Sequence, residues 1–195
     1  MDAQTIILRP TSTIEHGYAM TTQPNDVPES QIHTLVNEIE CDGGSTNVCL
    51  AEHTGELCSL EFGFDVSPLL NCEILSLNVN VRAITLASST SYNTDNKFIV
   101  NLYDGDTIVG SETLDFHTDG IPAGWATDPI TLSYISILDS IKSNHVTKIG
   151  LEYIPASATP SKGDDKTPKT ILVYISTVYI EMTYIGDIQD RKSVV

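Results

Sequence analysis

The sequence predicts an all-β protein, a two-sheet antiparallel sandwich of jelly-roll-like type with one short helix. Residues 171–185 form its densest run of β-branched and aromatic side chains, and Val178, Ile180, Met182 and Tyr184 alternate there with polar or aromatic neighbours. Several earlier segments alternate in the same way. Charged residues make up only 18% of the chain, which is typical of sheets whose exposed faces carry Thr, Ser and Asn.

One domain over residues 1–195 is expected, since a chain of this length can bury roughly 70% of its unfolded surface. Within it we expect a long N-terminal excursion at about 9–31 and a short solvated tail at 189–195. An immunoglobulin-like order is disfavoured, because all four cysteines precede the only tryptophan, Trp125.

In the N-terminal third, residues 5–8 read as a strand that Arg9-Pro10 ends, because proline removes a ladder donor. The excursion shows no sustained periodicity. It is our expected site for a segment that lies on a neighbouring subunit, with packing on its own sandwich as the alternative. Residues 32–39 and 47–51 read as two strands of a hairpin around a Gly-rich turn.

The middle of the chain predicts two strands. Residues 56–65 place Leu60, Phe62 and Phe64 on one face. Residues 74–86 alternate until the apolar phase slips at Ala83-Ile84, which predicts a β-bulge.

The C-terminal half predicts a hairpin, a helix and the closing strands. Asp104-Gly105-Asp106 is a hairpin turn between two strands, because glycine tolerates positive φ. Ile135, Leu138 and Ile141 recur every three residues and predict one short amphipathic helix over 133–143. The remaining segments are a strand at 148–154, a loop rich in Pro, Lys and Asp at 156–168, and the closing strands at 171–185.

The charge narrows the choice of partners. With 26 acidic and 10 basic residues the net charge is −16, which disfavours nucleic acid and anionic membranes as partners. The same charge also serves simply to keep a soluble protein dispersed. The N-terminus has only a short apolar run at residues 6–8, and no segment has about 18 consecutive apolar residues. We therefore expect a soluble protein made in the cytoplasm.

The cysteines predict buried thiols first, disulfides second and a metal site last. They are Cys41, Cys49, Cys58 and Cys72, and no two of them have CxxC spacing.

No motif of nucleophilic, metal or phosphate chemistry is present: GxSxG, HExxH and GxGxxG do not occur. The five histidines are scattered singly, and Asp115, His117 and Asp119 have alternate spacing that a solvent-facing strand explains. Turn chemistry accounts for Asp104 and Asp106. We therefore predict no enzyme, and no catalytic, cofactor-binding or metal-binding residues.

Three aromatic residues are candidates for stacking on sugars, namely Tyr92, Trp125 and Tyr134. Buried packing is the commoner fate of aromatic side chains, so both interpretations stay open.

Six short strings together resemble a group of virion structural proteins from tailed bacteriophages and prophages of Gram-positive bacteria. They are IILRPTS at 6–12, LVNE at 35–38, DGGST at 42–46, EFGFDVS at 61–67, VNVRA at 79–83 and VYIEMTY at 178–184. Such proteins are often more acidic where this chain has Gly43 and Gly44, and that departure argues against an ion bound at this turn.

The resemblance implies a jelly-roll-like module of a phage particle and supplies no catalytic residues. Our expectation is a non-enzymatic capsid decoration or head accessory protein on the outer surface of the virion, assembled in the host cytoplasm. Its expected partners are the major capsid protein or other virion proteins, and we expect the chain itself to form a homo-oligomer. The alternatives are a carbohydrate-binding or receptor-binding module of a tail appendage and, third, a cell-wall glycan hydrolase.

Overall fold

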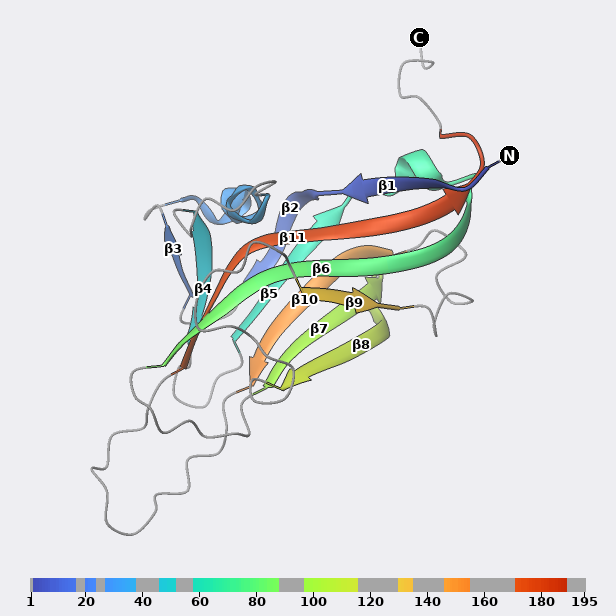
Figure 1. The fold of residues 1–195 in the computed structure, drawn as a ribbon. Coiled ribbons are helices and arrows are strands. Elements are labelled where there is room, and N and C mark those ends of the chain that lie inside the picture. The colour runs from blue at the N-terminus through green and yellow to red at the C-terminus, as the bar shows by residue number, and fades with distance from the viewer. Residues whose placement is uncertain are drawn as a thin grey trace, which may run out of the picture.

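The chain folds as two antiparallel β-sheets packed face to face, which confirms the predicted sandwich (Figure 1). The structure is a computed structural model. It describes residues 2–16, 20–23, 27–37, 46–51, 58–87, 97–115, 130–134, 146–154 and 171–188.

We call the two layers sheet A and sheet B. Sheet A has the order β3-β4-β11-β6-β9, with β1 also paired to β11, and sheet B has the order β2-β5-β10-β7-β8. The strands of sheet A are β1 (Gln4–Leu8), β3 (Met20–Gln23), β4 (Asn47–Ala51), β6 (Glu73–Ala87), β9 (Ile130–Ser133) and β11 (Ile171–Ile185). Those of sheet B are β2 (Pro10–His16), β5 (Cys58–Phe64), β7 (Lys97–Asp104), β8 (Thr107–Asp115) and β10 (Val146–Ile154).

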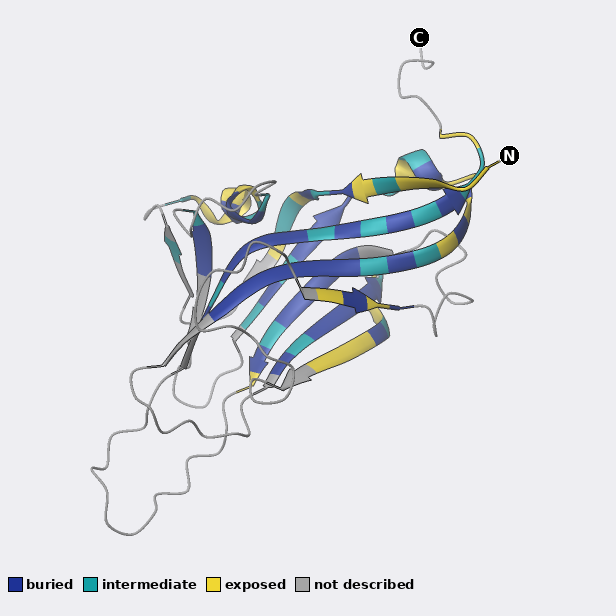
Figure 2. Cartoon of the chain, viewed as in Figure 1, coloured by how far each residue is buried: buried dark blue, intermediate teal, exposed yellow. Residues whose placement is uncertain are grey.

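The two longest strands, β6 and β11, have 15 residues each and pair along almost their whole length at the centre of sheet A. Val178, Ile180 and Met182 of β11 are buried, and the residues between them are less so, as Figure 2 shows by the alternating colours. The alternation in the sequence therefore identified the core face of the closing strand correctly.

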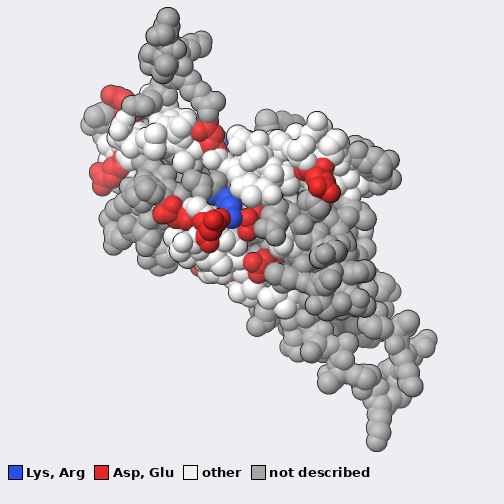
Figure 3. All heavy atoms as spheres, turned by 180° about the vertical axis from the view of Figure 1, so that it is seen from behind, with Lys and Arg blue, Asp and Glu red and all other residues white. Residues whose placement is uncertain are grey.

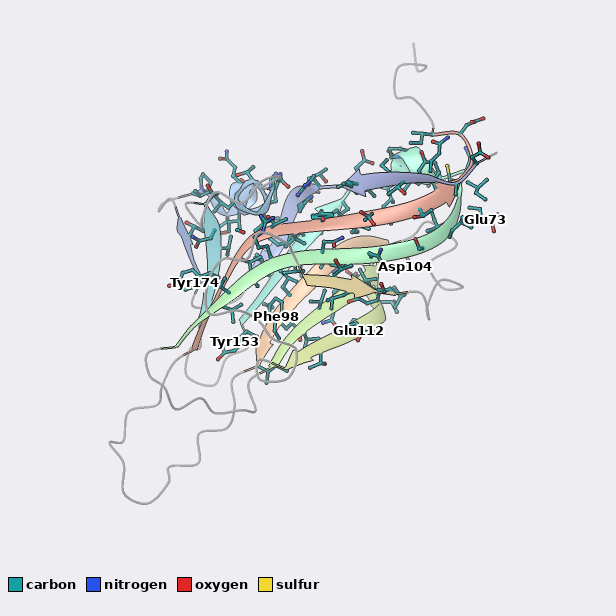
Figure 4. All side chains as sticks on the ribbon, in the orientation of Figure 1. Glu73, Phe98, Asp104, Glu112, Tyr153 and Tyr174 are labelled. Carbon is teal, nitrogen blue, oxygen red and sulfur yellow. The ribbon has the colours of Figure 1, made fainter. Side chains whose placement is uncertain are left out.

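Sheet B contributes the other half of the core. Leu60, Phe62 and Phe64 of β5 are buried, as predicted. Tyr153 of β10 and Phe98 of β7 are register partners, and both are at most 1% exposed (Figure 4). Aromatic and aliphatic side chains from both sheets thus fill the space between the layers.

The region 9–31, expected as a surface excursion, contains ordered elements instead. The chain crosses from sheet A to sheet B at Arg9-Pro10, and β2 and β3 then form edge strands of the two sheets. These strands are rich in Thr and Ser and pair with only one neighbour, so they lack the apolar alternation that marks a buried strand.

The strand predicted at 32–39 is wrong. The 3₁₀ helix η1 (Glu29–Val36) begins after Pro28 and buries Ile32, Leu35 and Val36, a spacing of three and one that fits one helical face. The predicted hairpin with 47–51 is wrong as well, because β4 pairs with β3 and β11.

The bulge is on the partner strand. Ala83 pairs with Ile175 and Arg82 with Thr177, so Ser176 of β11 is the extra residue. Ala83 and Ile84 are both buried, which explains the apolar phase slip in β6 without a bulge there.

The hairpin β7–β8 is confirmed, with Gly105 at φ 59° in the turn. Ser133 of the predicted helix ends β9, and residues 135–143 of that helix lie outside the described residues, as do the loop 156–168 and the tail 189–195. A second short 3₁₀ helix, η2 (Ser67–Leu69), links β5 to β6. Neither helix in the described ranges has the length and apolar character needed to span a membrane.

Candidate functional site

The face of sheet B that points away from the core carries a compact charged cluster around Gly150. We call Glu61, Tyr103, Asp106, Lys148 and Gly150 the lysine cluster. A Cβ atom on Gly150 would lie only 2.8 Å from a ring carbon of Tyr103, so the tyrosine ring covers the glycine. Lys148 Nζ lies 4.5 Å from the centroid of that ring, 2.8 Å from Glu61 Oε2 and 3.4 Å from Asp106 Oδ1.

These contacts keep Lys148 protonated. The bond to Glu61 raises the pKa of Lys148 and outweighs the opposing effect of burial, and Asp106 raises it further. Burial, followed by the negative charge of Glu61, raises the pKa of Tyr103. A protonated lysine is not a nucleophile, so this cluster holds the sheet together rather than activating a substrate.

The polar groups near the lysine cluster also bond to one another. Asn101 Nδ2 donates to Glu152 Oε1 at 3.0 Å, and Asn101 is 3% exposed. Figure 3, a view from behind, shows a small basic patch bordered by acidic side chains on the part of the surface that is drawn in colour. Asn101 and Glu152 of this outer face are therefore already paired with each other.

The outer face of sheet A is organised differently, in rows of side chains that run across the strands β9, β6, β11 and β1. One row is Ser133, Asn78, Glu181 and Ile7, and each residue is the register partner of the next. We call this row and the adjacent one, described below, the polar rows. Figure 1 shows these four strands side by side.

The second polar row consists of Thr131, Asn80, Tyr179 and Arg9. Asn80 pairs with both Thr131 and Tyr179, and the Arg9 guanidinium lies 4.6 Å from the centroid of the Tyr179 ring. Burial is the main effect that lowers the pKa of Arg9, the nearby Arg82 lowers it too, and Tyr179 opposes both. Arginine nevertheless stays charged, because its ordinary pKa lies far above neutral pH.

Some side chains in the polar rows hydrogen-bond to each other, and one buried donor does not. Ser133 Oγ donates to Asn78 Oδ1 at 2.8 Å, and Thr131 Oγ1 donates to Asn80 Oδ1 at 2.7 Å. Asn80 Nδ2 is buried and, within the described part of the chain, has no hydrogen-bond partner. An unsatisfied buried amide costs stability, so this donor is a feature that a ligand or a partner could use.

One end of this face is closed. Arg82 is 5% exposed and its Nη1 donates to Thr177 Oγ1 at 3.0 Å, and Thr177 forms an isolated bridge with Asn37. The accessible part of the face therefore lies toward Thr183 and Ile7, where the side chains are half-buried or exposed.

Of the two interpretations that the sequence leaves open for Tyr134, stacking on sugars is wrong and buried packing is confirmed. This residue is 2% exposed, and its hydroxyl donates to the Val100 carbonyl at 3.0 Å. Burial, with a smaller effect of Glu112, raises its pKa. Tyr92 and Trp125 lie outside the described residues. Tyr134 is thus a core residue whose polar end is satisfied internally.

The remaining sequence candidates take structural places. Asp104 and Asp106 flank the hairpin turn, and Asp106 contacts Lys148.

The His33 amide donates to Thr13 Oγ1 at 2.8 Å. Asp115 ends β8, while His117 and Asp119 are outside the described residues. Across the described ranges, no group of three or more His, Cys, Asp or Glu side chains could hold a metal ion.

Only one of the four thiols can be placed. Cys72 is a buried thiol whose pKa is raised by burial and by Asp187, and its Sγ donates to the Asp187 carbonyl at 3.7 Å. Cys49 and Cys58 lie in β4 and β5 without described side chains, and Cys41 lies outside the described residues. The preference for buried thiols is therefore confirmed for Cys72 alone.

No protein-family model matches the chain, and no curated protein is significantly similar to it. The resemblance to virion structural proteins therefore stays a prediction.

None of the residues of the polar rows was predicted as a site residue. Their signal was present strand by strand, since Asn78 and Asn80 alternate with apolar residues, as does Glu181. What joins them into one face is the register between strands far apart in the sequence.

Proposed function

We propose that the chain is a non-enzymatic structural protein of a bacteriophage virion, a capsid decoration or head accessory protein on the outer surface of the particle. One observation carries the proposal. Three of the strings that resemble virion proteins lie on β1, β6 and β11, and these strands are hydrogen-bonded neighbours in sheet A. These three strings therefore share one continuous part of sheet A, whereas the string at 61–67 lies on β5 and beyond, the string at 35–38 begins in η1, and the string at 42–46 lies mostly outside the described residues.

We also infer that strands β4 to β11 form a jelly roll. The first of these eight strands pairs with the last, β4 with β11, and the pairs β5–β10, β6–β9 and β7–β8 are nested inside it. Successive pairs belong alternately to sheet A and sheet B. Nested pairing of this kind supports two interlocked Greek keys, the arrangement that viral capsid and lectin domains share.

The charge supports a place on the outside of the particle. A chain with a net charge of −16 would be repelled by packaged DNA, whereas an outer surface imposes no such contact. The proposal includes assembly in the host cytoplasm, a homo-oligomeric state, and the major capsid protein or another virion protein as the partner.

Cryo-electron microscopy of particles from the encoding phage or prophage tests this proposal, because it locates and counts the chain at once. We expect a sandwich-shaped density repeated over the capsid lattice, in a copy number set by the shell. Absence of the chain from purified particles would contradict the proposal.

A tail-appendage module that binds carbohydrate or a receptor is the second candidate, and the polar rows on sheet A favour it. A few copies at the tail tip, rather than a lattice of copies, would select it over decoration. A cell-wall glycan hydrolase is the third candidate, and release of sugars from purified cell wall would select it.

A further inference from the structure

We propose that the polar rows on the outer face of sheet A form a binding site for an uncharged, extended oligosaccharide that lies across the strands. The inference does not depend on where in a virion the chain is located. It rests on four properties of this face: its hydrogen-bonding groups, their spacing, its planar and apolar side chains, and its local charge.

The hydrogen-bonding groups suit a sugar. Hydroxyl and amide side chains dominate the rows, and sugar hydroxyls both donate and accept hydrogen bonds. Asn78 is half-buried, and its Oδ1 accepts a hydrogen bond from Ser133 Oγ. We therefore infer that its amide nitrogen donates a hydrogen bond to the ligand. Ser133 and Thr131 are exposed at the β9 end of the rows.

The spacing suits a chain of sugars. Neighbouring strands in a sheet lie about 4.8 Å apart. That distance is close to the length of one hexose unit in an extended glycan, so a linear oligosaccharide laid across β9, β6, β11 and β1 would present about one sugar to each strand.

Part of the surface is planar or apolar. The Arg9 guanidinium carbon lies 4.6 Å from the centroid of the Tyr179 ring. Ile7, at the end of the other row, is 50% exposed. Such groups contact the C–H faces of sugar rings without needing hydrogen bonds.

The local charge favours an uncharged ligand. The accessible part of the rows holds one cation, Arg9, and one anion, Glu181, although the chain as a whole carries −16. An anionic glycan would gain little from this balanced pair and would be repelled by the rest of the molecule. The outer face of sheet B cannot take the same role, because its lysine cluster is already paired internally.

The test is a glycan array printed with neutral oligomers of N-acetylglucosamine, glucose, galactose, mannose and rhamnose, together with anionic uronic-acid oligomers. The purified full-length chain is applied, and titration calorimetry then measures the affinity for the best tetrasaccharide. We expect at least one neutral oligomer to bind. We also expect Asn78→Ala and Tyr179→Ala each to weaken that binding at least tenfold.

Ser111→Ala is the matched control for Ser133→Ala. Both serines are exposed on edge strands and each is the register partner of an asparagine, but Ser111 lies on sheet B opposite Asn101. Only Ser133→Ala should weaken binding, and thermal melts should show all these variants folded.

Three outcomes would overturn the site: no neutral oligomer binds, the uronic-acid oligomers bind better, or the sheet A variants bind as tightly as the unaltered chain. None of these changes the copy number in the particle, so failure of this inference is distinguishable from failure of the decoration proposal.

Discussion

The two outer faces of the sandwich use polar residues in opposite ways. On sheet B, Lys148, Glu61 and Tyr103 contact one another closely, and the side chains of the ion pair are only 11% and 13% exposed. On sheet A, Asn78 accepts a hydrogen bond from the exposed Ser133, and the amide nitrogen of Asn80 has no hydrogen-bond partner among the described residues. A polar face can thus act as a second, polar layer of packing or as a surface open to a ligand. The number of contacts that its polar side chains make with one another distinguishes these two roles.

The largest expected effect is the loss of Lys148. Lys148→Ala leaves the Glu61 carboxylate without its close cation, and we expect a loss of about 2–3 kcal/mol in the free energy of unfolding. A fully buried pair would cost about 3–5 kcal/mol, and the residual exposure reduces this. Urea denaturation measures it.

The double variant Lys148→Met/Glu61→Gln provides the control, because it removes both charges together. It should recover most of the lost stability. If the double variant were as unstable as Lys148→Ala, the ion pair would not be the reason for the loss.

Crowding at Gly150 ranks second. In Gly150→Val the new side chain collides with the Tyr103 ring, whose nearest carbon would be 2.8 Å from the added Cβ. We expect a loss of about 1–3 kcal/mol, the usual cost of overpacking. Adding Tyr103→Ala to Gly150→Val should be less than additive, since the collision is gone, and additive losses in urea denaturation would exclude the collision.

Alkaline pH should weaken sheet B by less than Lys148→Ala does. The pKa of Lys148 is raised above 10.5, so the folded state holds this proton more tightly than the unfolded chain. The resulting stability is complete below that pH and is lost as pH rises through the folded pKa. The raised pKa of Tyr103 acts in the same direction above pH 10.

Urea midpoints across about pH 10 to 12 measure this loss. The fall should be shallower in Lys148→Met/Glu61→Gln than in the unaltered chain. An equal fall in both would show that other groups cause it.

The smallest expected effect comes from sheet A. Asn78→Ala and Ser133→Ala should change the free energy of unfolding by no more than about 0.5 kcal/mol each, because these side chains are partly or fully exposed. Thermal melts beside Lys148→Ala make the contrast direct. A loss comparable to that of Lys148→Ala would mean that the two faces do not differ.

Much of the fold was predictable from local pattern. The closing strand, β5 with its three buried residues and the β7–β8 hairpin follow from alternation and from Gly105. The strand predicted at 32–39 is wrong because a short apolar run with Ile32, Leu35 and Val36 does not by itself separate a strand from a helix. The edge strands β2 and β3 were missed because polar strands with one neighbour carry no apolar signal.

The candidate site was less predictable than the fold. Pairing of Asn80 with Tyr179 and Thr131 joins residues that are 99 and 51 positions apart, and no local pattern encodes that register. The lysine cluster was equally hard to predict, because Glu61, Tyr103 and Lys148 come from three strands that are distant in sequence. Alternation within a strand shows which residues face outward. It does not show which outward-facing residues of different strands become neighbours.

The position of β11 has a consequence for how the chain folds as it is made. It is the last strand of the sandwich in the sequence, yet it lies inside sheet A, between β6 on one edge and β4 and β1 on the other. Until β11 has left the ribosome, the earlier strands β1, β4 and β6 lack the strand with which each of them pairs. Sheet A therefore closes late and through contacts distant in sequence, which predicts slow folding and exposes β6 to nascent-chain chaperones before β11 arrives.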